Sequence, residues 1–124
     1  MKTILIVDDS STMRRMIAAS LRDLPNIRFD EASTGLEAIE RLALTPVDLI
    51  MLDLNMPDMH GRDVVEFVRK NNGYRSIPII VLTTRGDEAS RSAVLAAGAT
   101  VYLTKPFQPH QLTAHVRELL KSIS

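Results

Sequence analysis

The chain has 124 residues, of which 45% are apolar and 24% charged, so it has room for one folded domain with a hydrophobic core and little room for a second. Fifteen basic residues balance fifteen acidic ones and cysteine is absent, which disfavours nucleic-acid binding and excludes disulfide bridges, thiolate zinc sites and thiol nucleophiles. Because the apolar runs are far shorter than the ~20 residues of a membrane helix and acidic residues closely follow the amino terminus, we expect a cytoplasmic protein with neither membrane span nor signal peptide.

The first predicted elements are a strand, a helix and a weaker strand. Residues 3–7 form a β-branched apolar run that predicts a buried strand. A helix is predicted from about residue 11 to residue 24, where Pro25 stops it, and residues 27–32 supply the weaker strand. The apolar face of this helix is predicted at Met13, Met16, Ile17, Ser20, Leu21 and Leu24, and the opposite face at Arg14, Arg15, Arg22 and Asp23.

A second helix and a third strand follow. Thr34 and Glu37 have the spacing of a capping box, in which each side chain satisfies a backbone N–H group of the first turn, and Pro46 closes the helix. Residues 49–52 are four consecutive apolar residues that end at Asp53, a pattern typical of a strand covered on both faces of a parallel sheet. The buried stripe of the helix is predicted at Leu36, Ile39 and Leu42.

The middle of the chain continues the alternation of helix and strand. A third helix is predicted after the loop 57–61, with an apolar face at Val64, Phe67 and Val68. Residues 77–82 predict another buried strand, which carries its proline near the start, where a proline costs least.

The last predicted elements are a helix, a short strand and a closing helix. The fourth helix begins at Asp87 and ends near Ala97, before Gly98, a common residue after a helix end. Residues 101–104 form the last strand, and Pro109 suits the first turn of the closing helix. Five strands that alternate with five helices predict a doubly wound α/β fold, a parallel sheet with helices on both faces. The closing helix is predicted to bury Leu112, Val116, Leu119, Leu120 and Ile123.

Polar residues follow four of the predicted strands directly: Asp8 and Asp9, Asp53, Thr83, and Lys105. Each alone is common as a turn former, a helix cap or a solvated lysine. In a parallel sheet, however, the carboxyl ends of the strands share one edge, so these side chains are expected to meet. Three carboxylates together repel one another, which raises the pKa of at least one of them unless a divalent cation binds. All-oxygen ligands suit Mg²⁺ or Mn²⁺.

This set of side chains predicts phosphoryl chemistry. The Lys105 ammonium and the Thr83 hydroxyl are suited to bind phosphoryl oxygens, and a metal, an ammonium and a hydroxyl together stabilise the negative charge of a transferring phosphoryl group. Asp53 protrudes from its strand end and is therefore the better candidate nucleophile among the three acids.

The motifs that carry these residues resemble a known family. The chain is similar to the receiver domain of two-component response regulators, and closely to the stand-alone CheY-like chemotaxis regulators, over essentially its whole length. The resemblance implies a flavodoxin-like fold with strand order 2-1-3-4-5 and a single receiver domain over residues 1–124 without an output domain. The matching segments are Val7–Arg15, Asp53–Pro57, Leu82–Thr83, Ala97–Ala99 and Lys105–Phe107.

The resemblance also implies a chemistry. Asp53 accepts a phosphoryl group from a phosphohistidine of a histidine kinase. Asp8, Asp9, Asp53 and the backbone carbonyl of Asn55 hold Mg²⁺, and Lys105 pairs with the phosphoryl group. The peptide bond between Lys105 and Pro106 is expected to be cis. The protein is then a phosphoacceptor switch with intrinsic autophosphorylation and autodephosphorylation rather than a conventional enzyme.

A switch and an output surface are implied as well. Thr83 moves to the phosphoryl oxygen and Tyr102 turns inward behind it, so that new negative charge biases an element with two arrangements. A downstream protein is expected to bind the face of the fourth helix, the last strand and the fifth helix, where apolar area is available, and the protein itself is expected to be a monomer. The residues expected to supply that area are Ala89, Ala93, Ala96 and Tyr102.

Four positions vary within the family or depart from its closest pattern. His60 stands where an acidic or amide residue is common, beyond the expected metal ligands, so no loss of phosphorylation is expected. Thr84 is larger than the residue often found there and is a candidate to narrow access to the phosphoryl group. Asn55 and Arg85 occupy positions that tune the lifetime of the acyl phosphate; Arg85 either shields the phosphoryl group from water or stays solvated.

Two other classes of function are weighed against this one. A phosphohydrolase of the dehalogenase type also forms an aspartyl phosphate, but it needs an acid two residues after the nucleophile, where this chain has Asn55. A flavin or nucleotide carrier on the same fold needs a glycine-rich phosphate loop after the first strand, where this chain has two acidic residues.

Overall fold

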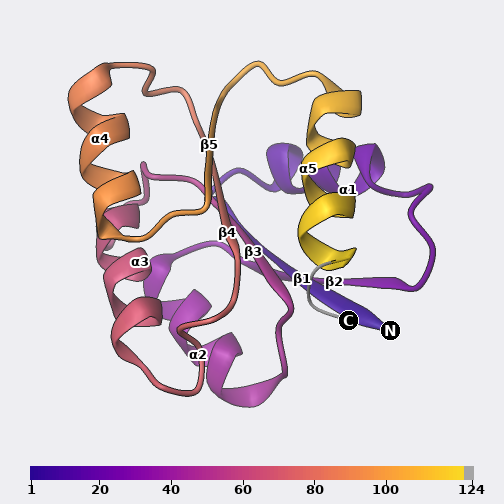
Figure 1. Ribbon diagram of the computed structural model, residues 1–124, viewed down its shortest axis with the longest axis horizontal. Helices are drawn as coiled ribbons and strands as arrows, with labels where there is room; N and C mark the ends of the chain where they lie inside the picture. Colours follow the sequence, from indigo (N-terminus) through magenta and orange to yellow (C-terminus); the bar gives the residue numbers. More distant parts are fainter. Residues whose placement is uncertain (122–124) are drawn as a thin grey trace.

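In the computed structural model, which describes residues 1–121, strands and helices alternate along the chain (Figure 1). None of the helices within these residues combines the length and the apolar character that a bilayer crossing requires. The strands are β1 (Lys2–Val7), β2 (Ile27–Ala32), β3 (Leu49–Leu52), β4 (Ile79–Thr83) and β5 (Val101–Thr104). The helices are α1 (Ser11–Ser20), α2 (Gly35–Leu44), α3 (Gly61–Lys70), α4 (Glu88–Ala97) and α5 (Pro109–Lys121).

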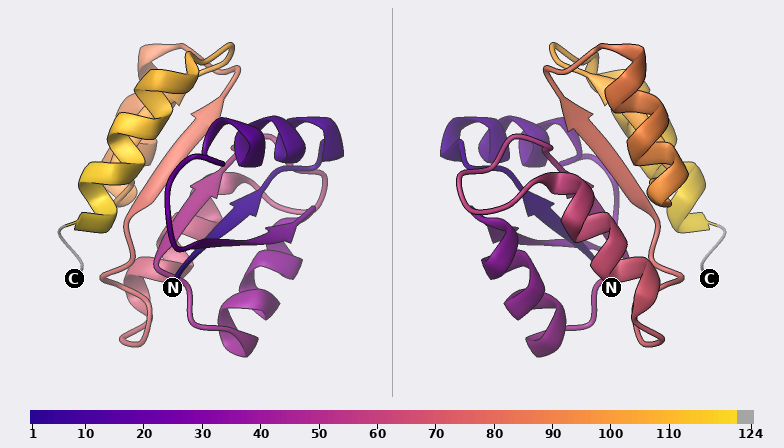
Figure 2. Two further views of the ribbon diagram at one scale, coloured as in Figure 1. Left: turned by 90° about the vertical axis from the view of Figure 1, so that its right-hand side faces the viewer. Right: turned by 90° about the vertical axis from the view of Figure 1, so that its left-hand side faces the viewer.

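The five strands form one parallel sheet in the order β2-β1-β3-β4-β5, which confirms both the fold class and the strand order. Helices α1 and α5 cover one face, and α2, α3 and α4 cover the other, as the two side views of Figure 2 show. All strands run in the same direction, so their carboxyl ends meet at one edge of the sheet.

Each face of the sheet has its own core. Side chains of β1, β3 and β4 alternate between the two faces, which is why the central strands read as unbroken apolar runs. On the side of α1 and α5 the buried residues outside the strands are Ile17, Leu21, Leu24, Leu112, Val116 and Leu120; on the other side the buried helical residues are Ala38, Leu42, Val64, Val65, Val68 and Val94.

Three details of the predicted helices differ from the structure. Helix α1 ends at Ser20, and residues 21–24 form turns in which Leu21 and Leu24 still pack on the sheet. Met16 is 49% exposed because the buried side of this helix runs through Ile17. Leu36 is 56% exposed, since the buried side of α2 is formed by the smaller residues Gly35 and Ala38 together with Leu42. Ile123 lies outside the described residues.

Helix α3 begins in direct contact with the end of β3. The backbone N–H group of Gly61 donates to the carbonyl oxygen of Leu54 at 3.0 Å. A Cβ atom at Gly61 would lie 2.7 Å from Leu54 Cα and 2.8 Å from the carbonyl oxygen of Asp53. Only a glycine allows the two backbones to approach this closely. The preceding His60 caps the helix, because its Nδ1 accepts from the N–H group of Arg62 at 3.0 Å.

Gly61→Ala is expected to destabilise the fold by about 2 kcal/mol, because the added methyl group meets backbone atoms that have no rotamer to adopt. Urea denaturation followed by circular dichroism measures the effect. Gly73→Ala is the matched control, since its Cβ meets only the Asn71 side chain, at 3.3 Å. Equal stability of the two variants would contradict the proposed close contact.

Candidate functional site

The carboxyl edge of the sheet brings together the side chains that follow β1, β3, β4 and β5. Asp8 and Asp53 are buried, with 2% and 6% of their surface exposed, Thr83 is fully buried, and Asp9 is exposed. Residues almost a hundred positions apart in sequence are therefore direct neighbours in this site.

Asp8, Asp9 and Asp53 form an acidic cluster. One carboxylate oxygen of each lies within 4.8 Å of the other two. An open depression of about 530 Å³ adjoins the cluster and is bounded by Asp9 and residues 54–60. Three convergent oxygen ligands beside an open space fit a small divalent cation that keeps several waters.

Lys105 reaches into this cluster from the end of β5. Its Nζ atom lies 2.7 Å from Asp8 Oδ2 and 3.8 Å from Asp53 Oδ2, and its side chain is only 11% exposed. The Lys105–Pro106 peptide bond that follows is cis, as the family resemblance implied. The same Asp8 carboxylate accepts from the N–H group of Ser10 at 2.9 Å, so both of its oxygens are engaged.

The pKa of the Asp53 carboxyl is raised above its usual value, mainly because burial removes water from the ionised form. The Lys105 ammonium and the N–H group of Asn55, which donates to Asp53 Oδ1 at 3.3 Å, counteract this rise. The charges of Asp8 and Asp9 raise the pKa by smaller amounts. The sequence argument anticipated a raised pKa, but repulsion among the acids is a lesser cause of it than burial.

The loop between β3 and α3 is fixed to α2 by a residue that the sequence reasoning did not single out. Both carboxylate oxygens of Asp58 accept from backbone N–H groups at the start of α2, from Gly35 at 3.0 Å and from Leu36 at 2.8 Å. These hydrogen bonds, that of Leu36 first, lower the pKa of the Asp58 carboxyl. Its place after a proline suggested only a turn, and no local spacing signals a partner in another helix.

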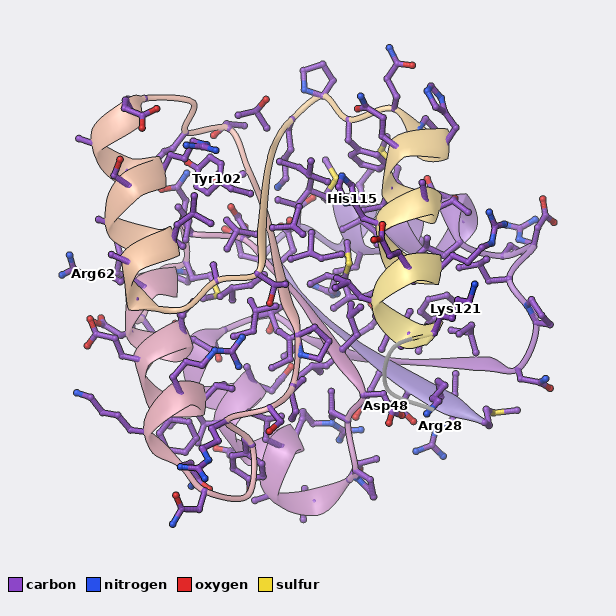
Figure 3. The ribbon with its side chains drawn as sticks, viewed as in Figure 1. Arg28, Asp48, Arg62, Tyr102, His115 and Lys121 are labelled. Carbon is purple, nitrogen blue, oxygen red and sulfur yellow. The ribbon has the colours of Figure 1, made fainter. Side chains whose placement is uncertain are left out.

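Arg85 connects the remaining predicted residues. Its N–H group donates to the Thr83 hydroxyl at 3.3 Å, its Nε donates to Asn55 Oδ1 at 3.0 Å, and its carbonyl oxygen accepts from the Tyr102 hydroxyl. Tyr102 lies on the side of β5 that faces α4 (Figure 3). Within residues 1–121, Thr83 and Tyr102 share no hydrogen bond and are linked through Arg85. The Thr84 hydroxyl accepts from the Asn55 amide at 3.5 Å.

Comparisons with known proteins agree with this arrangement. The model of the response regulator receiver domain family matches residues 4–117. The chain is 42% identical to chemotaxis protein CheY1 of Helicobacter pylori over 118 residues, which is 94% of this chain and 95% of that protein. It is also 40% identical to the transcriptional regulatory protein ResD of Bacillus subtilis over 121 residues, which is 98% of this chain and 49% of that protein.

A solved structure gives the same result. The chemotaxis protein CheY4 of Vibrio cholerae superimposes with a TM-score of 0.87 at 34% sequence identity, covering 96% of this chain and 98% of that one. The matched family model, the identities and the observed strand order therefore agree over nearly the whole sequence. The chain belongs to the response regulator receiver domain family.

Proposed function

We propose that this protein is the response regulator of a two-component phosphorelay in which Asp53 accepts a phosphoryl group from a phosphohistidine of a histidine kinase. The observation that carries the proposal is the position of Lys105, whose ammonium lies 2.7 Å from Asp8 and 3.8 Å from Asp53 within the acidic cluster. A fixed cation between a candidate nucleophile and a second acid is what phosphoryl transfer to a carboxylate needs.

In the proposed reaction, a carboxylate oxygen of Asp53 attacks phosphorus, and the bond between phosphorus and the histidine nitrogen breaks. The bonding electron pair leaves with the imidazole, which takes up a proton, and an acyl phosphate remains on Asp53. Lys105 pairs with a phosphoryl oxygen. We propose that Asp8, Asp9, Asp53 and the carbonyl of Asn55 hold Mg²⁺, which would neutralise phosphoryl charge when bound. The Asn55 amide is too weak an acid to act as the general acid of a dehalogenase-type phosphohydrolase, so no observation favours that function.

Phosphorylation is proposed to act through Thr83 and Tyr102. The Thr83 hydroxyl is held by the N–H group of Arg85, and the Tyr102 hydroxyl by the carbonyl of the same residue. If Thr83 moves to the phosphoryl group, the peptide groups of Arg85 must rearrange and Tyr102 loses or changes its partner. The side-chain hydrogen bond between Arg85 and Asn55, two residues after Asp53, supports a role of both residues in the lifetime of the acyl phosphate.

The proposed output surface is the face of α4, β5 and α5. A pocket of about 440 Å³ on this face includes Tyr102, Phe107, Arg91 and Gln111. We propose that a downstream protein binds here to the monomeric regulator, and that the process is chemotaxis or motility control in the cytoplasm. The similarity to two CheY proteins over nearly their whole length supports this process.

The direct test is phosphorylation with radiolabelled acetyl phosphate. Wild-type protein is expected to take up label that hydroxylamine removes, because an acyl phosphate is sensitive to this nucleophile, and to take up none when EDTA replaces Mg²⁺. Label that resists hydroxylamine, or that forms equally well in EDTA, would refute the proposed chemistry.

Thr83→Ala is expected to take up label as the wild type does but to lose the response of Tyr102. The buried hydroxyl acts after the transfer step, so its removal leaves the nucleophile intact. Beryllofluoride, an analogue of the phosphoryl group, combined with nuclear magnetic resonance of the Tyr102 ring, measures the response. Thr83→Ser retains the hydroxyl and serves as the control; a normal Tyr102 response in Thr83→Ala would show that this hydroxyl is not the relay.

A further inference from the structure

Arg14, the fourth residue of α1, lies against the backbone of the acidic cluster. Its Nη1 donates to the carbonyl oxygen of Asp8 at 2.6 Å, and its Nε donates to Glu31 Oε1 on β2 at 2.7 Å. The side chain is only 16% exposed, although the sequence pattern placed it on the solvent face of the helix. Two charge-assisted hydrogen bonds therefore hold the guanidinium in one orientation.

The contact with Arg14 gives the carbonyl oxygen of Asp8 a hydrogen-bond partner, and the orientation of Asp9 depends on this carbonyl group. The Asp8 N–H group donates to Ala32 at 3.1 Å, its carboxylate binds Ser10 and Lys105, and its carbonyl oxygen binds Arg14. Within residues 1–121, in contrast, no hydrogen bond reaches the Asp9 carboxylate. The carbonyl of Asp8 belongs to the rigid, planar peptide that leads into Asp9, so fixing this carbonyl sets the direction in which the Asp9 backbone leaves.

We propose that Arg14, oriented by Glu31, is a positioning residue that fixes the peptide between Asp8 and Asp9 so that the Asp9 carboxylate converges with those of Asp8 and Asp53 on a divalent cation. This inference rests on the proposed function and adds a residue that does not itself touch the cation. Partners of metal ligands act in this way in many sites, where their loss reduces metal affinity ~10–100-fold.

The direction in which cation affinity changes when Arg14 is removed separates a positioning role from simple electrostatics. Arg14 is positively charged, so its charge alone opposes the binding of a cation, and removing that charge should tighten binding. If Arg14 acts by holding the Asp8–Asp9 peptide, its removal should weaken binding instead. Arg15 is the matched control, because it is the next residue of the same helix, carries the same charge, is exposed and makes no hydrogen bond to Asp8 within the described residues.

Isothermal titration calorimetry with Mg²⁺, on full-length protein shown by circular dichroism to be folded, tests the proposal. Arg14→Ala is expected to weaken Mg²⁺ binding at least ~10-fold, whereas Arg15→Ala leaves the affinity unchanged or slightly higher. Glu31→Ala should weaken binding in the same direction, and the double variant should be no weaker than Arg14→Ala alone, since the two residues act as a unit. Should Arg14→Ala fail to fold, Arg14→Lys supplies the decisive measurement, because it keeps the positive charge but cannot donate to both the Asp8 carbonyl and Glu31 in the same geometry.

The outcomes separate the positioning role of Arg14 from the proposed function of the site. If wild-type protein binds Mg²⁺, loses this binding in Asp53→Ala, and binds it equally well or better in Arg14→Ala and Glu31→Ala, the positioning role is refuted and the proposed function stands. If wild-type protein shows no Mg²⁺ binding that depends on Asp53, the metal-dependent function is refuted, and the role of Arg14 with it.

Discussion

Replacing Asp53 by asparagine is expected to reduce phosphoryl labelling by acetyl phosphate, or by a phosphorylated histidine kinase, to background. The amide is isosteric with the carboxylate but is not a nucleophile towards phosphorus, so the change removes the proposed acceptor atom and leaves the site geometry in place. The measurement is the amount of hydroxylamine-sensitive label per mole of protein in the presence of Mg²⁺.

The same substitution, although it abolishes labelling, should increase the stability of the fold at neutral pH. Burial raises the folded-state pKa of Asp53 above the ordinary value near 3.8, so the native state binds more protons than the unfolded state between the two values. Stability is therefore lost as the pH rises through this window, and at neutral pH the ionised carboxylate disfavours folding. Asp53→Asn cannot ionise and should be more stable than wild type at pH 7 in EDTA, with a difference that disappears in acid.

A suitable control is Asp48→Asn, which changes a carboxylate at the opposite end of the same strand. The Asp48 carboxylate accepts from the N–H group of Thr3 at 2.8 Å and lies just before β3, at the end of the sheet away from the acidic cluster (Figure 3). It should take up label normally. Full labelling of Asp53→Asn would assign the phosphoryl group to another residue.

Lys105→Met is expected to destabilise the protein by about 2–3 kcal/mol in EDTA, because it leaves the buried Asp8 carboxylate without its cation. The value lies below the ~3–5 kcal/mol typical of breaking a buried ion pair, since the exposed Asp9 side chain leaves the site open to water and Ser10 still donates to Asp8. Without the ammonium, the pKa of Asp53 should rise further, as Lys105 now lowers it.

Added Mg²⁺ should reverse much of this loss. The Lys105 ammonium and a bound cation are both attracted to the Asp8 carboxylate and repel each other, so the variant is expected to bind Mg²⁺ more tightly than wild type and to regain stability on binding. Thermal unfolding with and without Mg²⁺ measures both effects, and Lys70→Met on the exposed surface of α3 is the control. The phosphorylated variant should also fail to switch partner binding. Equal stability of Lys105→Met and wild type in EDTA would contradict the ion pair.

The sequence alone predicted the location of the site because parallel strands place their carboxyl ends at one edge. Asp8 and Lys105 are 97 positions apart, yet each follows a short apolar run, and this local pattern was sufficient to pair them. The same logic placed Asp53 beside them. These predictions depend only on strand direction and not on the details of side-chain packing.

Features that depend on packing between elements could not be read from local patterns. Leu42 is buried in α2 as predicted, but spacing alone does not show that the small residues Gly35 and Ala38 face the sheet and leave Leu36 exposed. The contacts of Asp58 with α2 and of Arg14 with Asp8 were missed for a related reason: the partners in these contacts are backbone groups, and any residue type supplies these.

The attachment of the loop after Asp53 makes the two sides of the site mechanically unequal. Two hydrogen bonds fix Asp58 to α2, and Gly61 lies against Leu54, so the loop before α3 is held on both sides. The opposite side, residues 84–87, is exposed and contacts this loop through two side-chain hydrogen bonds with Asn55, one from Arg85 and a longer one to Thr84. Under the proposed function, a phosphoryl group on Asp53 would therefore displace residues 84–87 more readily than the loop before α3, and the displaced segment carries the Arg85 carbonyl that holds the Tyr102 hydroxyl.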